Sequence, residues 1–197
     1  MYYCITRKLQ AEVKIQRSQF IAVLYPAANP DEAKNALAEH QRQYADATHN
    51  CYAYICGLKR ETQYYADAGE PGGTAGKPIL NALLRGELTN ILAVVTRYYG
   101  GIKLGVKGLI DAYTLAVETA LEGAVLEPAR QYERLTVCCD YTVFESLKHR
   151  AKELEATIEN MEYDSRVSME MVIPEENLAQ MQEILDGYVL QTRLSYT

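Results

Sequence analysis

Short runs rich in hydrophobic residues recur through the first 130 residues, either alternating with polar residues, as at 11–17, or nearly continuous, and they predict β-strands. The run NILAVVTRY at 90–98 is the most hydrophobic of them, so we expect it at the centre of a sheet. The other strands of this part are expected at 11–17, 20–26, 50–57 and 62–66. A mixed sheet-and-helix fold follows, because helical patterns lie between these strands.

Hydrophobic residues at helical spacing predict three helices in the same part of the chain. The first has a clear start signal: Asn29 is the capping residue, Pro30 takes the first helical position, and Asp31 and Glu32 fill the first turn. The helices are expected at 31–43, 79–85 and 109–123. Glycine-rich loops at 67–78 and 100–108 precede the second and third helices.

Residues 133–197 are predicted to form short strands and helices in a regular order. Strands are expected at 133–140, 157–163, 167–173 and 188–194, and helices at 142–153 and 175–185. This βαββαβ order is the ferredoxin-like pattern. Pro128 marks a hinge, so we expect two domains, 1–128 and 133–197. The predicted fold class is α/β (α+β), with two tandem α/β sandwich domains.

The distribution of charge agrees with this division. The chain has a net charge of −6, yet residues 1–130 contain 14 basic and 13 acidic residues, whereas residues 131–197 contain 6 and 13. A shift from a net +1 to a net −7 at one point along the chain is typical of two separate units.

Composition limits the classes of protein to consider. Hydrophobic residues make up 48% of the chain, which excludes disorder, and five cysteines without C-x-x-C spacing favour a reducing compartment. The sequence predicts neither a signal peptide nor a segment that would span a membrane. We therefore expect a cytoplasmic monomer without a membrane partner. The 16 tyrosines are expected half-buried on strands; a surface platform for stacking bases is the alternative.

The two glycine-rich loops match neither of the common nucleotide motifs. A P-loop requires G-x-x-x-x-G-K-[ST], but Pro71 stands five residues before Gly76, and Lys77 is followed by Pro78. The glycines of the second loop, at 100, 101, 105 and 108, do not fit G-x-G-x-x-G. A nucleotide fingerprint of either kind is therefore not supported.

The loops nevertheless combine glycine with positive charge. Residues 68–110 contain five basic residues (Lys77, Arg85, Arg97, Lys103 and Lys107) and two acids (Glu70 and Glu87). Glycines before a helix expose backbone amides that bind anions. We expect Lys77, Arg97, Lys103 and Lys107 to face one cleft that takes an anion or an acidic partner. The alternative is that the glycines make tight turns and the lysines are only solvated.

Three segments carry a resemblance to a known family. ATHNCYAYI (47–55), DAGEPGGTAGKPIL (67–80) and NILAVVTRYYGGIKLGVKGLIDAY (90–113) resemble, in this order and spacing, bacterial YigZ-like members of the IMPACT family. The resemblance implies binding residues in the motif loops: Glu70, Gly73, Thr74, Gly76, Lys77, Arg97, Tyr98, Gly100, Gly101, Lys103, Gly105 and Lys107. Lys107 and Asp111 depart from the family pattern, which usually has Gly and Arg there, and this puts a ligand contact at position 111 in doubt.

The resemblance also implies a fold and a function. It implies a first domain similar to domain IV of elongation factor G and a second similar to domain V of that factor. Eukaryotic relatives act in the general amino-acid control of translation. We therefore expect a non-catalytic binding protein, a regulator of translation that contacts RNA, the ribosome or a translation factor through the basic glycine loops. The alternative is a small hydrolase or transferase that acts on a phosphorylated ligand in the same cleft.

Candidate catalytic residues are few. His49 and Cys51 lie on one face of a strand, but parallel side chains on one strand make a poor nucleophile–base pair. Asp67 and Glu70 form a possible acid–base or metal pair, although the turn at Glu70 favours a carboxylate that caps backbone amides. Arg97 is expected to pair with Glu70 or Asp67. We predict no catalytic residue, no metal and no cofactor.

Overall fold

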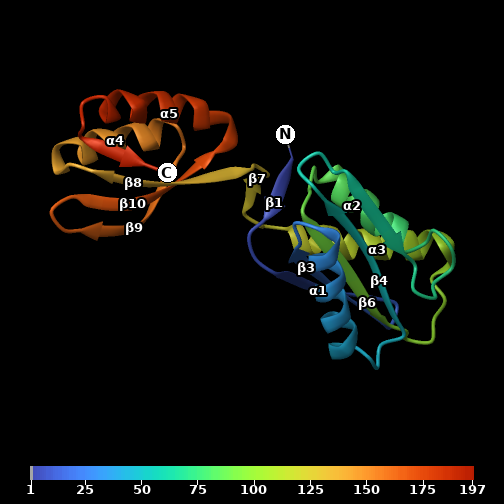
Figure 1. Ribbon diagram of the computed structural model, residues 1–197. Helices are drawn as coiled ribbons and strands as arrows, with labels where there is room; N and C mark the ends of the chain where they lie inside the picture. Colours follow the sequence, from blue (N-terminus) through green and yellow to red (C-terminus); the bar gives the residue numbers. More distant parts are fainter. Residues whose placement is uncertain (1) are drawn as a thin grey trace. The chain divides into compact units, whose positions relative to one another are not determined.

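A five-stranded antiparallel sheet forms the centre of the N-terminal part of the computed structural model, which describes residues 2–197 (Figure 1). Its strands follow the order β2-β3-β6-β4-β5. They comprise β2 (Leu9–Ile15), β3 (Ser18–Pro26), β4 (His49–Cys56), β5 (Thr62–Ala66) and β6 (Ile91–Tyr98). As the hydrophobic pattern predicts, β6 is the central strand, and only its last residue is not fully buried.

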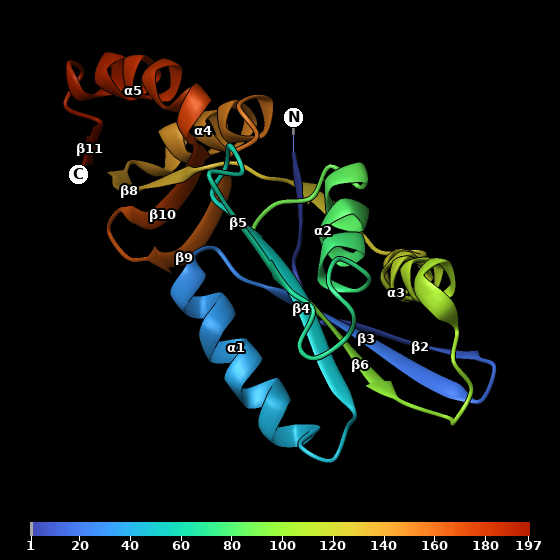
Figure 2. The ribbon, with the colours of Figure 1, turned by 90° about the vertical axis from the view of Figure 1, so that its right-hand side faces the viewer.

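Helices cover both faces of this sheet (Figure 2). On one face α1 (Pro30–Gln43) packs over the small cluster that includes Ala33, Leu92 and Val94. On the other face α2 (Gly76–Arg85) and α3 (Gly105–Leu121) bury the main core. Two short strands, β1 (Tyr3–Ile5) and β7 (Leu126–Pro128), pair with each other outside this sheet. The result is a three-layer arrangement around the central strand.

The helix starts show where local sequence decides structure. Asn29 caps α1: its Oδ1 accepts hydrogen bonds from the amides of Asp31 and Glu32 at 3.1 and 3.0 Å, which confirms the predicted start. The other two helices begin earlier than predicted. Helix α2 takes Pro78 into its first turn, where the missing amide does no harm, and α3 begins at Gly105, inside the expected loop.

The second sheet has the strand order β11-β8-β10-β9, in which all neighbours are antiparallel. Its elements are β8 (Tyr132–Cys139), α4 (Tyr141–Glu153), β9 (Thr157–Tyr163), β10 (Val167–Pro174), α5 (Glu175–Val189) and β11 (Leu194–Tyr196). The core lies between this sheet and the two helices. This is the ferredoxin-like arrangement, and the expected α+β class is confirmed.

One predicted strand of this unit is wrong. The pattern predicts a last strand over 188–194, but Tyr188 and Val189 end α5, and the strand begins only at Leu194. The ring of Tyr188 packs against the core from the helix, and its hydroxyl lies 2.9 Å from Ser146 Oγ of α4. Tertiary contacts therefore override the strand preference of these side chains.

A buried histidine links α1 to the sheet. His40 is 1% exposed, and its Nε2 lies 2.7 Å from Thr96 Oγ1, while its Nδ1 lies 2.9 Å from the Tyr25 hydroxyl. Because the Thr96 hydroxyl donates to Asn50 Oδ1, it accepts from His40 Nε2–H, which leaves Nδ1 as the acceptor of the Tyr25 proton. Burial, with a smaller effect from Lys8, lowers the pKa of His40 to about 4.

Stability should therefore fall in mild acid through His40. Its pKa in the folded state lies below the ordinary value of 6.5, so its contribution is complete above pH 6.5 and is lost as the pH falls toward 4. The loss amounts to roughly 3 kcal/mol at most. The free energy of unfolding, measured with urea at several pH values between 7 and 4, should fall more steeply with decreasing pH in the parent than in His40→Gln. An equal dependence on pH in the two proteins would contradict this assignment.

Contacts between residues divide the chain into two compact units, one that ends at Ala129 and one from Arg130 to Thr197. We propose that each folds independently, as domains 1–128 and 133–197. Limited proteolysis should then cut within 128–133 and release two pieces that each unfold cooperatively, because domain boundaries lie in short connecting segments. Mass spectrometry locates the cut and circular dichroism follows unfolding. Unfolding of both pieces after the cut would show that the units depend on each other.

Candidate ligand-binding site

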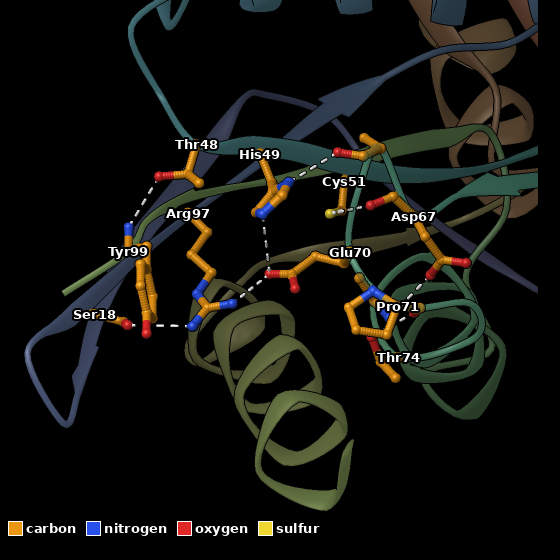
Figure 3. A network of polar contacts seen from close by, with 12 residues as sticks. Ser18, Thr48, His49, Cys51, Asp67, Glu70, Pro71, Thr74, Arg97 and Tyr99 are labelled. Atoms are coloured by element: carbon orange, nitrogen blue, oxygen red, sulfur yellow. Dashed lines mark hydrogen bonds and ion pairs between the residues drawn. The ribbon is translucent and has the colours of Figure 1, made fainter. Parts of the chain in front are cut away.

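A buried ion pair lies where the central strand ends (Figure 3). Arg97, near the end of β6, donates from Nη1 to Oε1 of Glu70 at 2.6 Å. Their side chains are only 6% and 4% exposed. The Tyr113 hydroxyl of α3 donates to the same carboxylate oxygen at 2.8 Å. The expected pairing of Arg97 with an acid of the first glycine loop is confirmed, and the acid is Glu70.

The remaining contacts of Arg97 fix its guanidinium group. Its Nη2 donates to Ser18 Oγ at 3.4 Å, and its Cζ lies 5.3 Å from the ring centre of Phe20 and 5.1 Å from that of Tyr99. The register explains this cluster, because Phe20 and His49 flank Arg97 on the two neighbouring strands. Its Nε is buried and has no hydrogen-bond partner among the described residues. One donor of a nearly buried cation is thus unused.

Asp67 shapes the first glycine loop. Its carboxylate accepts hydrogen bonds from the amides of Gly73, Ala75 and Gly76 at 2.8, 3.0 and 2.8 Å. The prediction that Glu70 caps the turn is therefore wrong, since the capping carboxylate is that of Asp67. The difference arises because Glu70 turns inward to meet Arg97. A Cβ at Gly76 would lie 2.7 Å from the backbone of Ala66, so the loop packs closely on β5.

The second glycine loop is held against the turn between β2 and β3. A Cβ at Gly100 would clash with the carbonyl group of Arg17, and the Gly100 amide donates to Ser18 Oγ at 3.2 Å. Gly105 then begins α3 with a φ of +71°, in the left-handed region that favours glycine. Leu104 precedes the helix and supplies no side-chain cap. The first amides of α3 therefore have no side-chain acceptor from the capping position.

These elements surround a pocket of about 360 Å³. Its walls are mostly hydrophobic. The polar residues that line it are the paired Arg97 and Glu70 and the exposed Lys103. The residues that line it are Glu70, Pro71, Arg97, Tyr99, Lys103, Leu104, Gly105, Val106 and Leu109. Tyr99 is 44% exposed, so part of its ring is open to a ligand.

The structure brings only part of the predicted set into this pocket. Four predicted residues line it: Glu70, Arg97, Lys103 and Gly105. Others shape the loops, namely Gly73, Thr74, Gly76, Gly100 and Gly101. Lys77 and Lys107 are exposed and do not line it, so the expectation that they share one cleft with Arg97 is wrong.

Tyr98 belongs to a different surface. Its hydroxyl donates to Asp46 Oδ1 at 2.9 Å, beyond the end of α1. Alternation along β6 explains this, because neighbouring residues of a strand point to opposite faces and Arg97 points inward. The aromatic residue of the pocket is Tyr99, which is not among the predicted binding residues. Tyr113, at the end of the third motif segment, is not among them either. Two features of the sequence could have identified them. Tyr99 stands two residues after Arg97, and Tyr113 lies on the buried face of α3.

The Cys51 and His49 side chains do not form a catalytic pair. Cys51 is fully buried, and its Sγ lies 2.9 Å from the carbonyl oxygen of Asp67 and 3.3 Å from the Tyr113 hydroxyl. Burial raises the pKa of this thiol to about 12, so it is neutral at pH 7 and a poor nucleophile. His49 Nδ1 donates instead to the carbonyl of Ala68 at 3.0 Å.

Metal clusters and membrane-spanning helices are both absent from residues 2–197. No group of three or more His, Cys, Asp or Glu side chains in this range is arranged to hold a metal ion. Nor does this part of the chain contain a helix with the length and apolar character needed to cross a membrane.

Fold and pocket together define a two-unit α+β protein with a small pocket at the end of its central strand. Several known proteins are similar to it in sequence. The model of the Impact N-terminal domain matches residues 16–121. IMPACT family member YvyE of Bacillus subtilis is 33% identical over 174 residues, which cover 88% of this chain and 80% of that protein. IMPACT family member YigZ of Escherichia coli is 32% identical over 169 residues, covering 85% and 83%.

A solved structure extends the similarity to the whole chain. A crystal structure described as that of a hypothetical protein is 28% identical, with a TM-score of 0.67, and the match covers 99% of this chain and 95% of that one. The chain belongs to the IMPACT family, as the three motif segments predict. The match of the family model includes both glycine loops and every residue that lines the pocket.

Proposed function

We propose that this protein is a non-catalytic binding protein that contacts RNA, free or within the ribosome, in the regulation of translation. One observation carries the proposal: cations gather around the open start of α3 in a chain whose net charge is −6. Lys103 lines the pocket, and Lys107 is exposed in the first turn of α3. Arg17 is also exposed, and its backbone packs against Gly100.

The nearby acids offset these cations only in part. Glu70 is buried and already paired with Arg97. Asp111 is exposed four residues after Lys107 on α3, so it offsets part of the charge of Lys107, and it stands where the family usually has an arginine. Lys103 and Arg17 have no such neighbour on the helix. The Debye length at physiological salt is about 8 Å, so the more distant acidic residues are largely screened from this surface. A local positive surface therefore persists, and it suits phosphate groups.

The arrangement supports binding rather than chemistry. Glu70 is held by two donors, Arg97 and Tyr113, and the Cys51 thiol is neutral. A general base or a nucleophile needs a free and accessible group near its reacting atom. These contacts favour the binding protein over the alternative of a hydrolase or transferase.

The link to translation rests on the family and the fold. The chain belongs to the IMPACT family, whose N-terminal domain is expected to resemble domain IV of elongation factor G. That resemblance supports RNA or the ribosome as the partner, although fold likeness alone is a weak guide to function. The positive surface at α3 adds a physical reason that is independent of the family.

Reversing the charge of this surface should weaken binding to RNA. The double variant Lys103→Glu/Lys107→Glu should bind ribosomes or single-stranded RNA at least about tenfold more weakly at low salt. For single-stranded RNA, its salt dependence should be flatter by roughly 0.7 units of slope for each phosphate that the variant no longer neutralises. Filter binding across a series of salt concentrations measures both quantities.

The matched control is Lys34→Glu/Lys59→Glu, which changes the net charge equally. Lys34 lies on α1, and Lys59 follows the end of β4 opposite to His49, so both lie away from the pocket. At physiological salt the control should bind within about twofold of the parent, because the Debye length is then about 8 Å and both changes lie away from the pocket. Equal binding by both double variants, with both as stable as the parent, would remove the proposed surface.

A further inference from the structure

We infer that the pocket at the end of β6 takes a single nucleotide unit, with its base beside Tyr99 and its phosphate at the start of α3 next to Lys103. The inference rests on the proposed contact with RNA and deepens it, because it names the part of the RNA that the pocket recognises. The same chemistry occurs in a free nucleoside monophosphate, and titration with both kinds of ligand separates these two sources.

The size of the pocket sets the scale of the ligand. Its volume is about 360 Å³, near the lower end of the range of roughly 300–1,000 Å³ that small-molecule sites span. One base with its sugar phosphate fits this scale, whereas a duplex does not. A strand would therefore enter with one nucleotide and continue across the exposed surface that carries Lys107.

The start of α3 provides a place for the phosphate. Gly105 and Val106 line the pocket, and no side chain caps the helix in front of them. The space where a Cβ of Gly105 would stand is open, so a phosphate oxygen can approach the backbone closely. Backbone amides at a helix start attract anions through hydrogen bonds and the helix dipole. Lys103 adds a full positive charge beside them.

Arg97 provides an independent indication of a polar ligand. Its side chain is only 6% exposed and lines the pocket, yet its Nε has no hydrogen-bond partner among residues 2–197. Buried donors are nearly always satisfied by protein, water or ligand. Because Glu70 offsets the charge of Arg97, the unused donor favours a neutral acceptor such as a base or sugar oxygen.

The walls favour a planar group over an acidic peptide. Pro71, Leu104, Val106 and Leu109 give the pocket a mostly hydrophobic surface. The Tyr99 ring lies 5.1 Å from the Arg97 guanidinium, so two flat groups capable of stacking meet here. Stacking on an aromatic ring is the common way in which proteins hold single-stranded bases. A carboxylate peptide would use Lys103 but would leave this ring without a matching partner.

The test measures binding of defined probes to the full chain by isothermal titration calorimetry at low salt. The probes are adenosine 5′-monophosphate, adenosine, inorganic phosphate, N-acetylleucine and an eight-nucleotide single-stranded RNA. The monophosphate should bind at least about tenfold more tightly than adenosine, inorganic phosphate or N-acetylleucine. Competition by the octamer would identify a nucleotide of an RNA strand as the source. Binding of the monophosphate without binding of the octamer would identify a free nucleotide.

Three variants assign the contacts. Tyr99→Ala should weaken binding of the monophosphate about tenfold or more, whereas Tyr99→Phe, which keeps the ring, should bind like the parent. Lys103→Ala should weaken the monophosphate but not adenosine. Lys77→Ala serves as the control, since Lys77 is exposed and does not line the pocket. Circular dichroism shows whether each variant is folded, and the Tyr99→Phe comparison holds the packing of the ring constant.

The outcomes separate this inference from the proposed function. If the octamer binds the parent and Tyr99→Ala equally well and the monophosphate binds neither, the pocket is not a nucleotide site, but the RNA contact stands. If the monophosphate binds as expected and the octamer does not bind, the pocket inference stands and the RNA contact fails. Tighter binding of N-acetylleucine than of the monophosphate would overturn the inference in favour of a carboxylate ligand.

Discussion

The buried contact between Arg97 and Glu70 is the interaction on which the N-terminal unit depends. It joins the end of β6 to the first glycine loop, and through Tyr113 and Ser18 it also fixes α3 and β3. Two charges that are almost fully buried are tolerated only as a well-bonded pair, and removal of one partner typically costs about 3–5 kcal/mol. Four segments that are distant in sequence therefore share one electrostatic requirement.

That requirement also shapes the site. Because the Glu70 carboxylate accepts hydrogen bonds from both Arg97 and Tyr113, this side of the pocket presents little free acid or base. The groups that remain available are the donor at Arg97 Nε, the first amides of α3, Lys103 and the ring of Tyr99. This combination of a preformed hollow with unused donors is suited to recognition, and preorganisation lowers the cost of binding.

Sequence predicts the elements better than it predicts the site. The central position of β6 and the start of α1 follow from local patterns, which are short-range effects. The last strand is misplaced by the pattern because Tyr188 is held in α5 by contacts with the core. Glu70 pairs with Arg97 instead of capping a turn, and Tyr98 bonds Asp46 instead of lining the pocket, for a similar reason. Whether a carboxylate caps a loop or enters an ion pair depends on tertiary packing, which spacing along the chain does not contain.

The most direct measurement compares stability with ligand binding when the pair is replaced as a unit. Glu70→Leu and Arg97→Met should each destabilise the protein strongly, whereas the double variant should recover much of that stability, because it leaves no uncompensated buried charge. Titration of the double variant with adenosine 5′-monophosphate then tests the central claim that this pair builds the site. The account predicts a folded protein whose affinity falls about tenfold or more. A stable double variant that binds the nucleotide as tightly as the parent would contradict it.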